Sequence, residues 1–315
     1  MADKRVIAVL GATGAQGGGL ARAILADQAS EFAVRAVTRD PSKEQASALA
    51  SAGAEVVQAD LDDEASLRSA FDGAYGAFCV TNFWEHFSPE KEVAQAGNMA
   101  RAAKAAGVQH AIWSTLEDTR EWVPLDDNRM PTLNEKYKVP HFDGKGEADR
   151  AFLENGLPTT FMLASWYFDN MIFFGHGPSR GDDGKLAFTL PLADGKLSGI
   201  AAGDIGKCAH GVFKRGNELV GQKLGIAGDQ RSGAEFAEAF TKLLGEEVVY
   251  RPFTFDQYRG LGFPGAEDLG NMFQFYAEFE QDVNGMRDVE RSRSLNPELQ
   301  SLETWLAANK DRIPL

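Results

Sequence analysis

The chain has 315 residues, 46 of them acidic and 32 basic, and a formal net charge of −14. Because no long basic run offsets this negative charge, direct binding to nucleic acid or to an anionic membrane is disfavoured. The two cysteines are too few for a disulfide framework, and no signal-peptide pattern or long apolar span occurs, so we expect a soluble cytoplasmic protein.

Residues 5–38 have the order strand, glycine-rich turn, helix and strand. Arg5–Leu10 is a short apolar run typical of a buried parallel strand, and Leu20, Ile24 and Leu25 form a helical apolar stripe. A turn poor in side chains, followed by a helix N-terminus, suits a pyrophosphate, although such turns also connect ordinary strands and helices. In this context it predicts a dinucleotide-binding turn, made of Gly11, Ala12, Thr13, Gly14, Ala15, Gln16 and Gly17.

The end of the second strand indicates which dinucleotide. Phe32–Thr38 is followed by Arg39 and, one helical turn later, by Lys43. An arginine at this place suits the 2′-phosphate of NADP(H), whereas NAD sites usually present a carboxylate to the ribose hydroxyl. The alternative is a solvated basic pair, and Asp40 supplies a carboxylate one residue later. We predict NADP(H).

Alternation of strands and helices continues as far as residue 163. The pattern predicts an α/β fold with a doubly wound, mostly parallel, Rossmann-like sheet covered on both faces. A polar, proline-containing linker over 116–139 interrupts it and is expected above the carboxyl edge of the sheet, where ligands bind. The expected strands are 55–58, 77–80, 110–114 and 159–163, and the expected helices are 62–71, 88–107 and 142–155.

The composition changes after Ser165. Aromatic residues crowd together over 166–174, glycine-rich turns and short strands follow, and helices are expected at 233–244 and 266–279. We therefore divide the chain into an NADP-binding Rossmann-like domain, 1–165, and a smaller C-terminal α+β lobe, 166–315, some of whose segments return to the main sheet.

Several long motifs carry a family resemblance. The chain resembles the NmrA-like family of atypical short-chain dehydrogenase/reductases, and within it the NADP-binding redox-sensor proteins. The resemblance implies NADP(H) bound between the two lobes, and regulation, including transcriptional regulation, through cofactor occupancy. The motifs are GATGAQGG (11–18), VTRDPSK (37–43), EVVQADLDD (55–63), VTNFWE (80–85), HFDGKGE (141–147), WYFDN (166–170) and LGFPGAEDLGNMFQFYAEF (261–279).

The resemblance also implies roles for individual residues. Gly11 to Gln16 would hold the pyrophosphate, Arg39 and Lys43 the 2′-phosphate, and Asp60 and Leu61 the adenine edge. Thr81, Asn82, Phe83 and Lys145 would line the nicotinamide-side ribose, and Tyr167, Phe168, Asp169 and Asn170 would close over the nicotinamide. From the residues alone, Asp60 could simply begin a polar turn, the 166–168 cluster could be ordinary core, and Lys145 could be a solvated surface lysine.

The Tyr-x-x-x-Lys pair of catalytic short-chain dehydrogenases is missing. Tyr137 is followed four residues later by His141, with Pro140 expected to interrupt any helix, and Tyr276 is followed by Glu280. The Tyr-x-x-x-Lys spacing places both side chains on one helical face, where the lysine assists proton transfer by the tyrosine. Since neither tyrosine is followed by such a lysine, we predict no catalytic residue. The five histidines have no metal-ligand spacing, so no metal is expected.

The sequence therefore predicts an NADP(H)-binding regulatory protein with little or no turnover. A protein partner is expected, and a second copy of the chain is one candidate. Isoflavone-reductase-like relatives of this fold use a lone lysine as acid or base, which leaves an NADPH-dependent reductase using Lys145 as the alternative. An interaction scaffold with a vestigial cofactor site is a third hypothesis.

Overall fold

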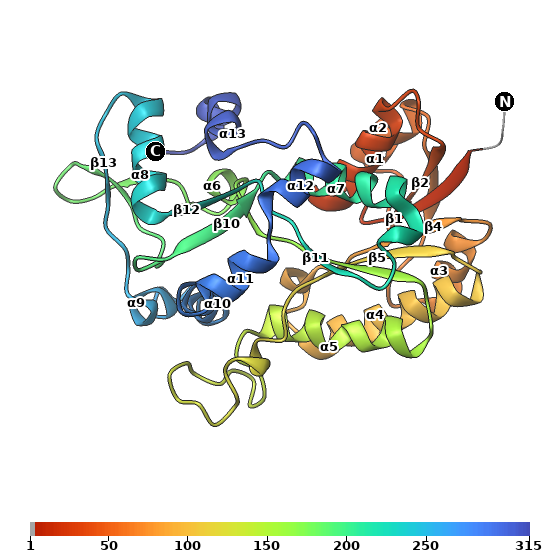
Figure 1. The fold of residues 1–315 in the computed structure, drawn as a ribbon, viewed down its shortest axis with the longest axis horizontal. Helices are drawn as coiled ribbons and strands as arrows, with labels where there is room; N and C mark the ends of the chain where they lie inside the picture. The colour runs from red at the N-terminus through yellow and green to blue at the C-terminus, as the bar shows by residue number, and fades with distance from the viewer. Residues whose placement is uncertain (1–3) are drawn as a thin grey trace.

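The computed structural model describes residues 4–315. Within this range seven parallel strands form the main sheet, in the order β11-β6-β5-β4-β1-β2-β3 (Figure 1). The order reverses between β1 and β4, and in open parallel sheets ligands bind beyond the carboxyl ends at such a point. The strands are β1 Arg5–Leu10, β2 Phe32–Thr38, β3 Glu55–Gln58, β4 Gly76–Cys79, β5 His110–Thr115, β6 Thr159–Leu163 and β11 Lys223–Gly225.

Helices cover both faces of this sheet, which confirms the doubly wound fold. Buried side chains of α1, α7 and the segment after α12 pack on one face, with α2 at its edge, and those of α3, α4 and α5 pack on the other (Figure 1). These helices are α1 Ala15–Ala26, α2 Glu44–Ser51, α3 Glu64–Phe71, α4 Pro89–Ala105, α5 Pro140–Glu154, α7 Ala202–Arg215 and α12 Val289–Leu295.

The second lobe lies at the carboxyl end of the sheet, on the left in Figure 1. Its core is rich in aromatic side chains and also includes Val123, Met130 and Val139 from the linker. Two small sheets, β12-β10-β7 and β13-β9-β8, frame it. Its elements are β7 Trp166–Tyr167, α6 Asn170–Phe173, β8 Ser179–Arg180, β9 Leu186–Phe188, β10 Lys196–Ile200, β12 Asp229–Ser232, α8 Gly233–Leu244, β13 Val248–Tyr250, α9 Phe255–Arg259, α10 Ala266–Glu278, α11 Glu280–Met286 and α13 Leu302–Asn309.

Some predicted boundaries were wrong. The expected strand 77–80 lies one residue earlier, at Gly76–Cys79, and the helix expected from 142 begins at Pro140. Pro140 does not interrupt a helix but starts one, because the first helical turn needs no N–H donor from it. The short strand β11 and helix α7 were not predicted as elements, although both pack on the main sheet.

Candidate cofactor site

The glycine turn after β1 can exist only with small residues. Gly11 has a φ of +62°, and the N–H of Gly14 donates to the carbonyl oxygen of Gly11 at 2.8 Å. A Cβ on Gly17 would lie 2.5 Å from the carbonyl oxygen of Leu10, so this glycine lets α1 pack tightly behind β1. The turn therefore brings bare backbone to the carboxyl edge, as a pyrophosphate site requires.

The N-terminus of α1 is left open. Gly14 is its N-cap and has no side-chain oxygen to offer, and the first turn contains no acidic residue. In contrast, Asp63, Ser88 and Ser232 cap α3, α4 and α8 with side-chain hydrogen bonds. Unsatisfied N–H groups at a helix start, with the positive end of the helix dipole, attract an anion.

Arg39 follows β2 and is paired with Glu85. Its guanidinium makes a two-pronged contact with this carboxylate, with 3.0 Å between Nη2 and Oε2. The hydrogen bonding raises the pKa of Arg39 and lowers that of Glu85. Arg39 is therefore not a freely solvated cation, while Lys43, the N-cap residue of α2, is exposed beside the same strand end.

Asp60 and Leu61 follow β3, as predicted, but Asp60 also shapes a turn. Its Oδ1 accepts from Asp62 N–H at 2.9 Å, and its own N–H donates to Ser66 Oγ at 3.0 Å. Asn98 Nδ2 donates to the Leu61 carbonyl oxygen at 2.8 Å. The turn interpretation of Asp60 is thus confirmed, and its exposed position leaves an adenine contact as a prediction.

Lys145 is a buried cation on α5, and its side chain reaches Thr81, just beyond the end of β4. Only 9% of it is exposed, which rules out the surface-lysine alternative. Its Nζ lies 2.8 Å from Glu92 Oε2 and donates to Thr81 Oγ1 at 2.5 Å, and Thr81 in turn donates to Glu92 at 2.6 Å. The lysine also lies over the Trp113 ring, 5.2 Å from its centroid.

Glu92 is the charged partner that sequence reasoning missed. It is 0% exposed, and burial alone would raise its pKa, but the charge of Lys145, the nearby His86 and the hydrogen bond from Thr81 lower the pKa to about 2. Its Oε1 has no hydrogen-bond partner among the described residues, and His86 Nε2 lies 3.5 Å from it. A sequence signal existed, because Glu92 is in helical phase with the buried Ala96 and Met99 of α4.

A chain of hydrogen bonds connects the glycine turn to the second lobe. Ser114 Oγ donates to Gln16 Oε1 at 2.7 Å, and Gln16 Nε2 donates to the Tyr167 hydroxyl at 2.6 Å. Burial raises the pKa of Tyr167 to about 12, so its hydroxyl stays protonated at neutral pH. Gln16 and Tyr167, predicted separately, therefore meet, while Ser114 was not predicted.

Other predicted residues pack in the core or make structural hydrogen bonds. Phe168 is fully buried under Gly199, where an added Cβ would collide with its ring, so the core interpretation holds for Phe168 and for its buried neighbour Trp166. Asp169 accepts from the Ala202 N–H at the start of α7 at 2.8 Å, and Asn170 begins the short helix α6. In this conformation Phe168 cannot close over a nicotinamide.

The short helix η1, Phe83–Glu85, follows β4 and joins an aromatic cluster. Asn82 is its exposed N-cap residue, and the buried Phe83 packs against Trp84 and against His141 of α5. His141 Nδ1 is 2.6 Å from Asp268 Oδ1 on α10. Phe83, which was predicted to line the ribose, is thus in contact with the His141–Asp268 pair between the lobes.

A second contact between the lobes was not predicted. Arg287, after α11, is fully buried and pairs with Glu117, with 2.9 Å between Nη2 and Oε2. It also donates to the carbonyl oxygen of Ala164 at 3.0 Å. Since Glu117 and Ala164 follow β5 and β6, this arginine attaches the second lobe to the carboxyl edge.

A family model, the NmrA-like family, matches residues 3–306. The chain belongs to the NmrA-like family. This confirms the resemblance inferred from the motifs.

Curated relatives match most of this NmrA-like chain. The oxidoreductase FrzB of Cladobotryum sp., described as containing an NmrA-like family domain, is 30% identical over 289 residues, or 86% of this chain and 83% of that protein. The similarly described hkm9 of Aspergillus hancockii is 30% identical over 86% and 82% of the two chains.

Solved structures share the fold. NmrA, described as a negative transcriptional regulator and solved in complex with NADP, is 24% identical, with a TM-score of 0.77 over 97% and 95% of the chains. Triphenylmethane reductase of Citrobacter sp., complexed with NADP(H), is 22% identical, with a TM-score of 0.73 over 95% and 97%. These likenesses confirm the Rossmann-like architecture of this NmrA-like protein.

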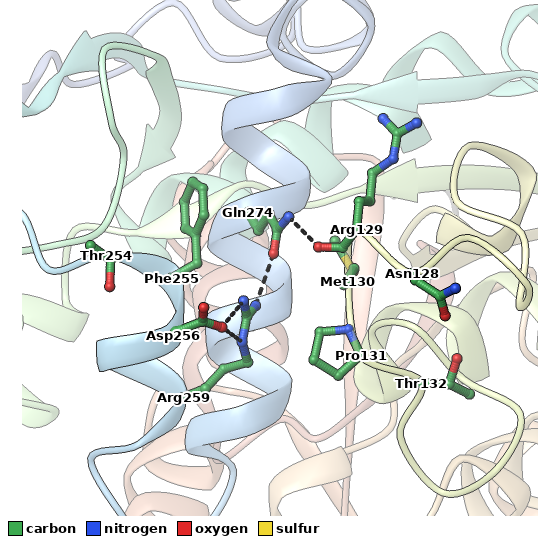
Figure 2. Close-up of a pocket in the computed structure, with 10 residues that line it drawn as sticks. All are labelled: Asn128, Arg129, Met130, Pro131, Thr132, Thr254, Phe255, Asp256, Arg259 and Gln274. Atoms are coloured by element: carbon green, nitrogen blue, oxygen red, sulfur yellow. Dashed lines mark hydrogen bonds and ion pairs between the residues drawn. The ribbon is translucent and has the colours of Figure 1, made fainter.

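A polar hollow of about 390 Å³ lies between the linker and helices α9 and α10 (Figure 2). Arg259 donates to Asp256 and Gln274, and Gln274 donates to the carbonyl oxygen of Arg129 at 2.9 Å. The linker is therefore fastened to α10. The residues lining this hollow include none of the predicted cofactor contacts.

Neither a metal-binding cluster nor a membrane-spanning helix occurs among the described residues. Over 4–315 no group of three or more His, Cys, Asp or Glu side chains could hold a metal ion. In the same range no helix is both long and apolar enough to cross a membrane.

Proposed function

We propose that this NmrA-like protein binds NADP(H) along the carboxyl edge of its main sheet. The observation that carries the proposal is that three features meet at the carboxyl ends of the adjacent strands β4, β1 and β2. The bare glycine turn follows β1, Arg39 follows β2, and the buried Lys145 of α5 contacts Thr81 just after β4. The turn and the uncapped α1 fit a pyrophosphate, and Arg39 with Lys43 fits a 2′-phosphate. The solved complexes of NmrA with NADP and with NAD support a nicotinamide dinucleotide as the ligand.

The function that we infer for the bound cofactor is regulatory. Gln16 of the glycine turn is hydrogen-bonded to Tyr167, and His141, which packs against Phe83, contacts Asp268. Occupancy of the site can therefore alter contacts between the lobes, provided that the cofactor binds one arrangement better than another. The description of NmrA as a negative transcriptional regulator supports this role. The protein surface altered by cofactor binding would be recognised by a protein partner, either another protein or a second copy of the chain, in the cytoplasm.

Calorimetric titration with NADPH, NADP⁺, NADH and NAD⁺ tests cofactor binding. We expect the phosphorylated pair to bind more tightly. Arg39→Gln should weaken NADPH about tenfold or more, because each hydrogen bond between charged groups contributes roughly 1.5–3 kcal/mol, and should barely affect NADH. The control is Arg180→Gln, since Arg180 makes a comparable exposed two-pronged pair with Glu246 in the second lobe. Equal affinity for NADH and NADPH would contradict the proposed preference.

A reductase is the second candidate, favoured by the burial of Lys145 and by the curated relatives described as oxidoreductases. Loss of absorbance at 340 nm with quinones, aldehydes and enones distinguishes the two functions. The regulatory proposal predicts no turnover above background. Cofactor oxidation that is abolished in Lys145→Arg, with NADPH affinity retained, would establish the reductase, because arginine keeps the positive charge beside Glu92 but does not give up its proton.

A further inference from the structure

The guanidinium of Arg39 already donates to a carboxylate, that of Glu85. Glu85 comes from η1, at the end of β4, and approaches Arg39 at the end of β2 with both carboxylate oxygens. A carboxylate in this fork has the planar, two-oxygen geometry that a phosphate also presents to arginine. Glu85 therefore takes the place at Arg39 that a 2′-phosphate would need.

The surroundings of the pair make this competition unfavourable for a phosphate. Besides Glu85, the carboxylates of Asp60 and Asp62 raise the pKa of Arg39. Lys91 lies 3.0 Å from Asp62 and offsets part of its charge, but Glu85 and Asp60 would still repel a group with a charge of about −1.5 to −2. A 2′-phosphate must displace Glu85 from the guanidinium and then remain close to it. A ribose hydroxyl imposes neither requirement, because it is uncharged.

The ion pair between Glu85 and Arg39 lies at the protein surface. The side chain of Glu85 is 46% exposed and that of Arg39 is 59% exposed, so the ion pair itself contributes little stability. The neighbouring Phe83 is buried in the aromatic cluster and keeps η1 in place. Displacing Glu85 from the guanidinium therefore involves an exposed side chain and not the buried aromatic cluster.

We propose that Glu85 is a specificity-determining residue, a built-in competitor that lowers affinity for phosphorylated dinucleotides by occupying Arg39. The inference rests on the proposed binding of NADP(H) at this edge. It assigns to Glu85 a selective effect: the carboxylate penalises NADP⁺ and leaves NAD⁺ almost unaffected. The protein is thereby set to respond to a higher NADP(H) concentration than its arginine alone would give.

Calorimetry on the full chain with Glu85→Gln tests the inference. We expect NADP⁺ to bind about threefold to tenfold more tightly than to the unmodified protein, with NAD⁺ changed less than twofold, because only the negative charge has been removed. Adenosine 2′,5′-bisphosphate and adenosine 5′-monophosphate, which differ only in the 2′-phosphate, should reproduce the difference. The control Glu246→Gln removes the carboxylate from the matched pair with Arg180 and should change neither affinity.

The outcomes separate this inference from the proposed function. If the unmodified protein binds no dinucleotide, the proposed function fails and the role of Glu85 fails with it. If NADP⁺ binds but Glu85→Gln leaves its affinity unchanged or weakens it, Glu85 is not a competitor and only this inference is overturned. A parallel gain for NAD⁺ would also overturn it, since the effect would then be general electrostatics and not competition at the 2′ position.

Discussion

Lys145 and Glu92 form a buried pair of opposite charges, and each residue stabilises the charged form of the other. Each charge is tolerated inside the protein only because the other is present, and Thr81 hydrogen-bonds to both. Removing one member leaves an uncompensated buried charge, which costs more than the pair contributes. The pair therefore constrains which substitutions the site accepts.

Glu92→Gln should destabilise the fold by about 3–5 kcal/mol, because it leaves the Lys145 ammonium buried without a counterion. Urea unfolding at pH 7 measures this loss. The double variant Glu92→Gln/Lys145→Met should lose less than the two single variants together, since both charges are then absent. Additive losses would show that the two side chains are not energetically coupled. Glu246→Gln, at an exposed pair, should stay within about 0.5 kcal/mol of the unmodified protein.

At the scale of elements, the closest approach in the first lobe is between α1 and α7. An added Cβ on Gly19 would lie 2.9 Å from the carbonyl oxygen of Gly203, and one on Gly206 would overlap the backbone of Gly19 and Leu20. The two helices therefore meet backbone to backbone. Gly19 therefore allows this close packing of α1 against α7.

Gly206→Ala should therefore destabilise the protein by about 1–3 kcal/mol through overpacking, despite the better helix propensity of alanine. Gly203→Ala is the matched control on the same helix, because nothing lies within 4 Å of its added Cβ. We expect this control to be neutral or slightly stabilising. Thermal unfolding of both variants decides the point, and equal effects would contradict the proposed close contact.

The sequence predicted those elements whose signals are local. The parallel strands from β1 to β6 and the glycine turn follow from apolar runs and glycine spacing. The strand β11 has only three residues and no distinctive pattern, and it is recruited by pairing with β6 some sixty residues earlier. Such a pairing depends on tertiary contacts, which local sequence patterns do not reveal.

The site residues divide in the same way. The glycine turn and Arg39 were found from spacing, but Glu85 and Glu92 were not, because each acts on a side chain distant in sequence. A helical signal for the burial of Lys145 did exist: Lys145, Ala148 and Phe152 share one buried face of α5. Reading this stripe would have favoured a buried lysine, without identifying its partner.

At the scale of the whole molecule, burial of histidines makes stability depend on pH. Burial lowers the pKa of His110, His176 and His210 to about 4, against 6.5 for an unfolded histidine. The unfolded chain thus binds more protons than the native chain between these values. Folding stability should be insensitive to these groups above pH 6.5 and fall as the pH decreases from 6.5 towards 4.

Urea unfolding from pH 7.5 to 4.5 measures this slope. Replacing His110 by Asn should remove about one proton from the linkage, which reduces the slope by up to about 1.4 kcal/mol per pH unit in this window. The variant starts from lower stability, because Thr160 loses the hydrogen bond to His110, but its pH profile should be flatter. An unchanged slope would mean that His110 is protonated in the native protein.

The route of the chain between the two lobes has a consequence for modularity. The second core takes Val123, Met130 and Val139 from the linker after β5, whereas β11 and α7 return from beyond residue 200 to complete the first sheet and its cover. A cut at residue 165 would expose one face of the sheet and deprive the second core of part of its wall. The two lobes are therefore not independent units: a chimera between relatives of this fold would have to exchange the interwoven segments together.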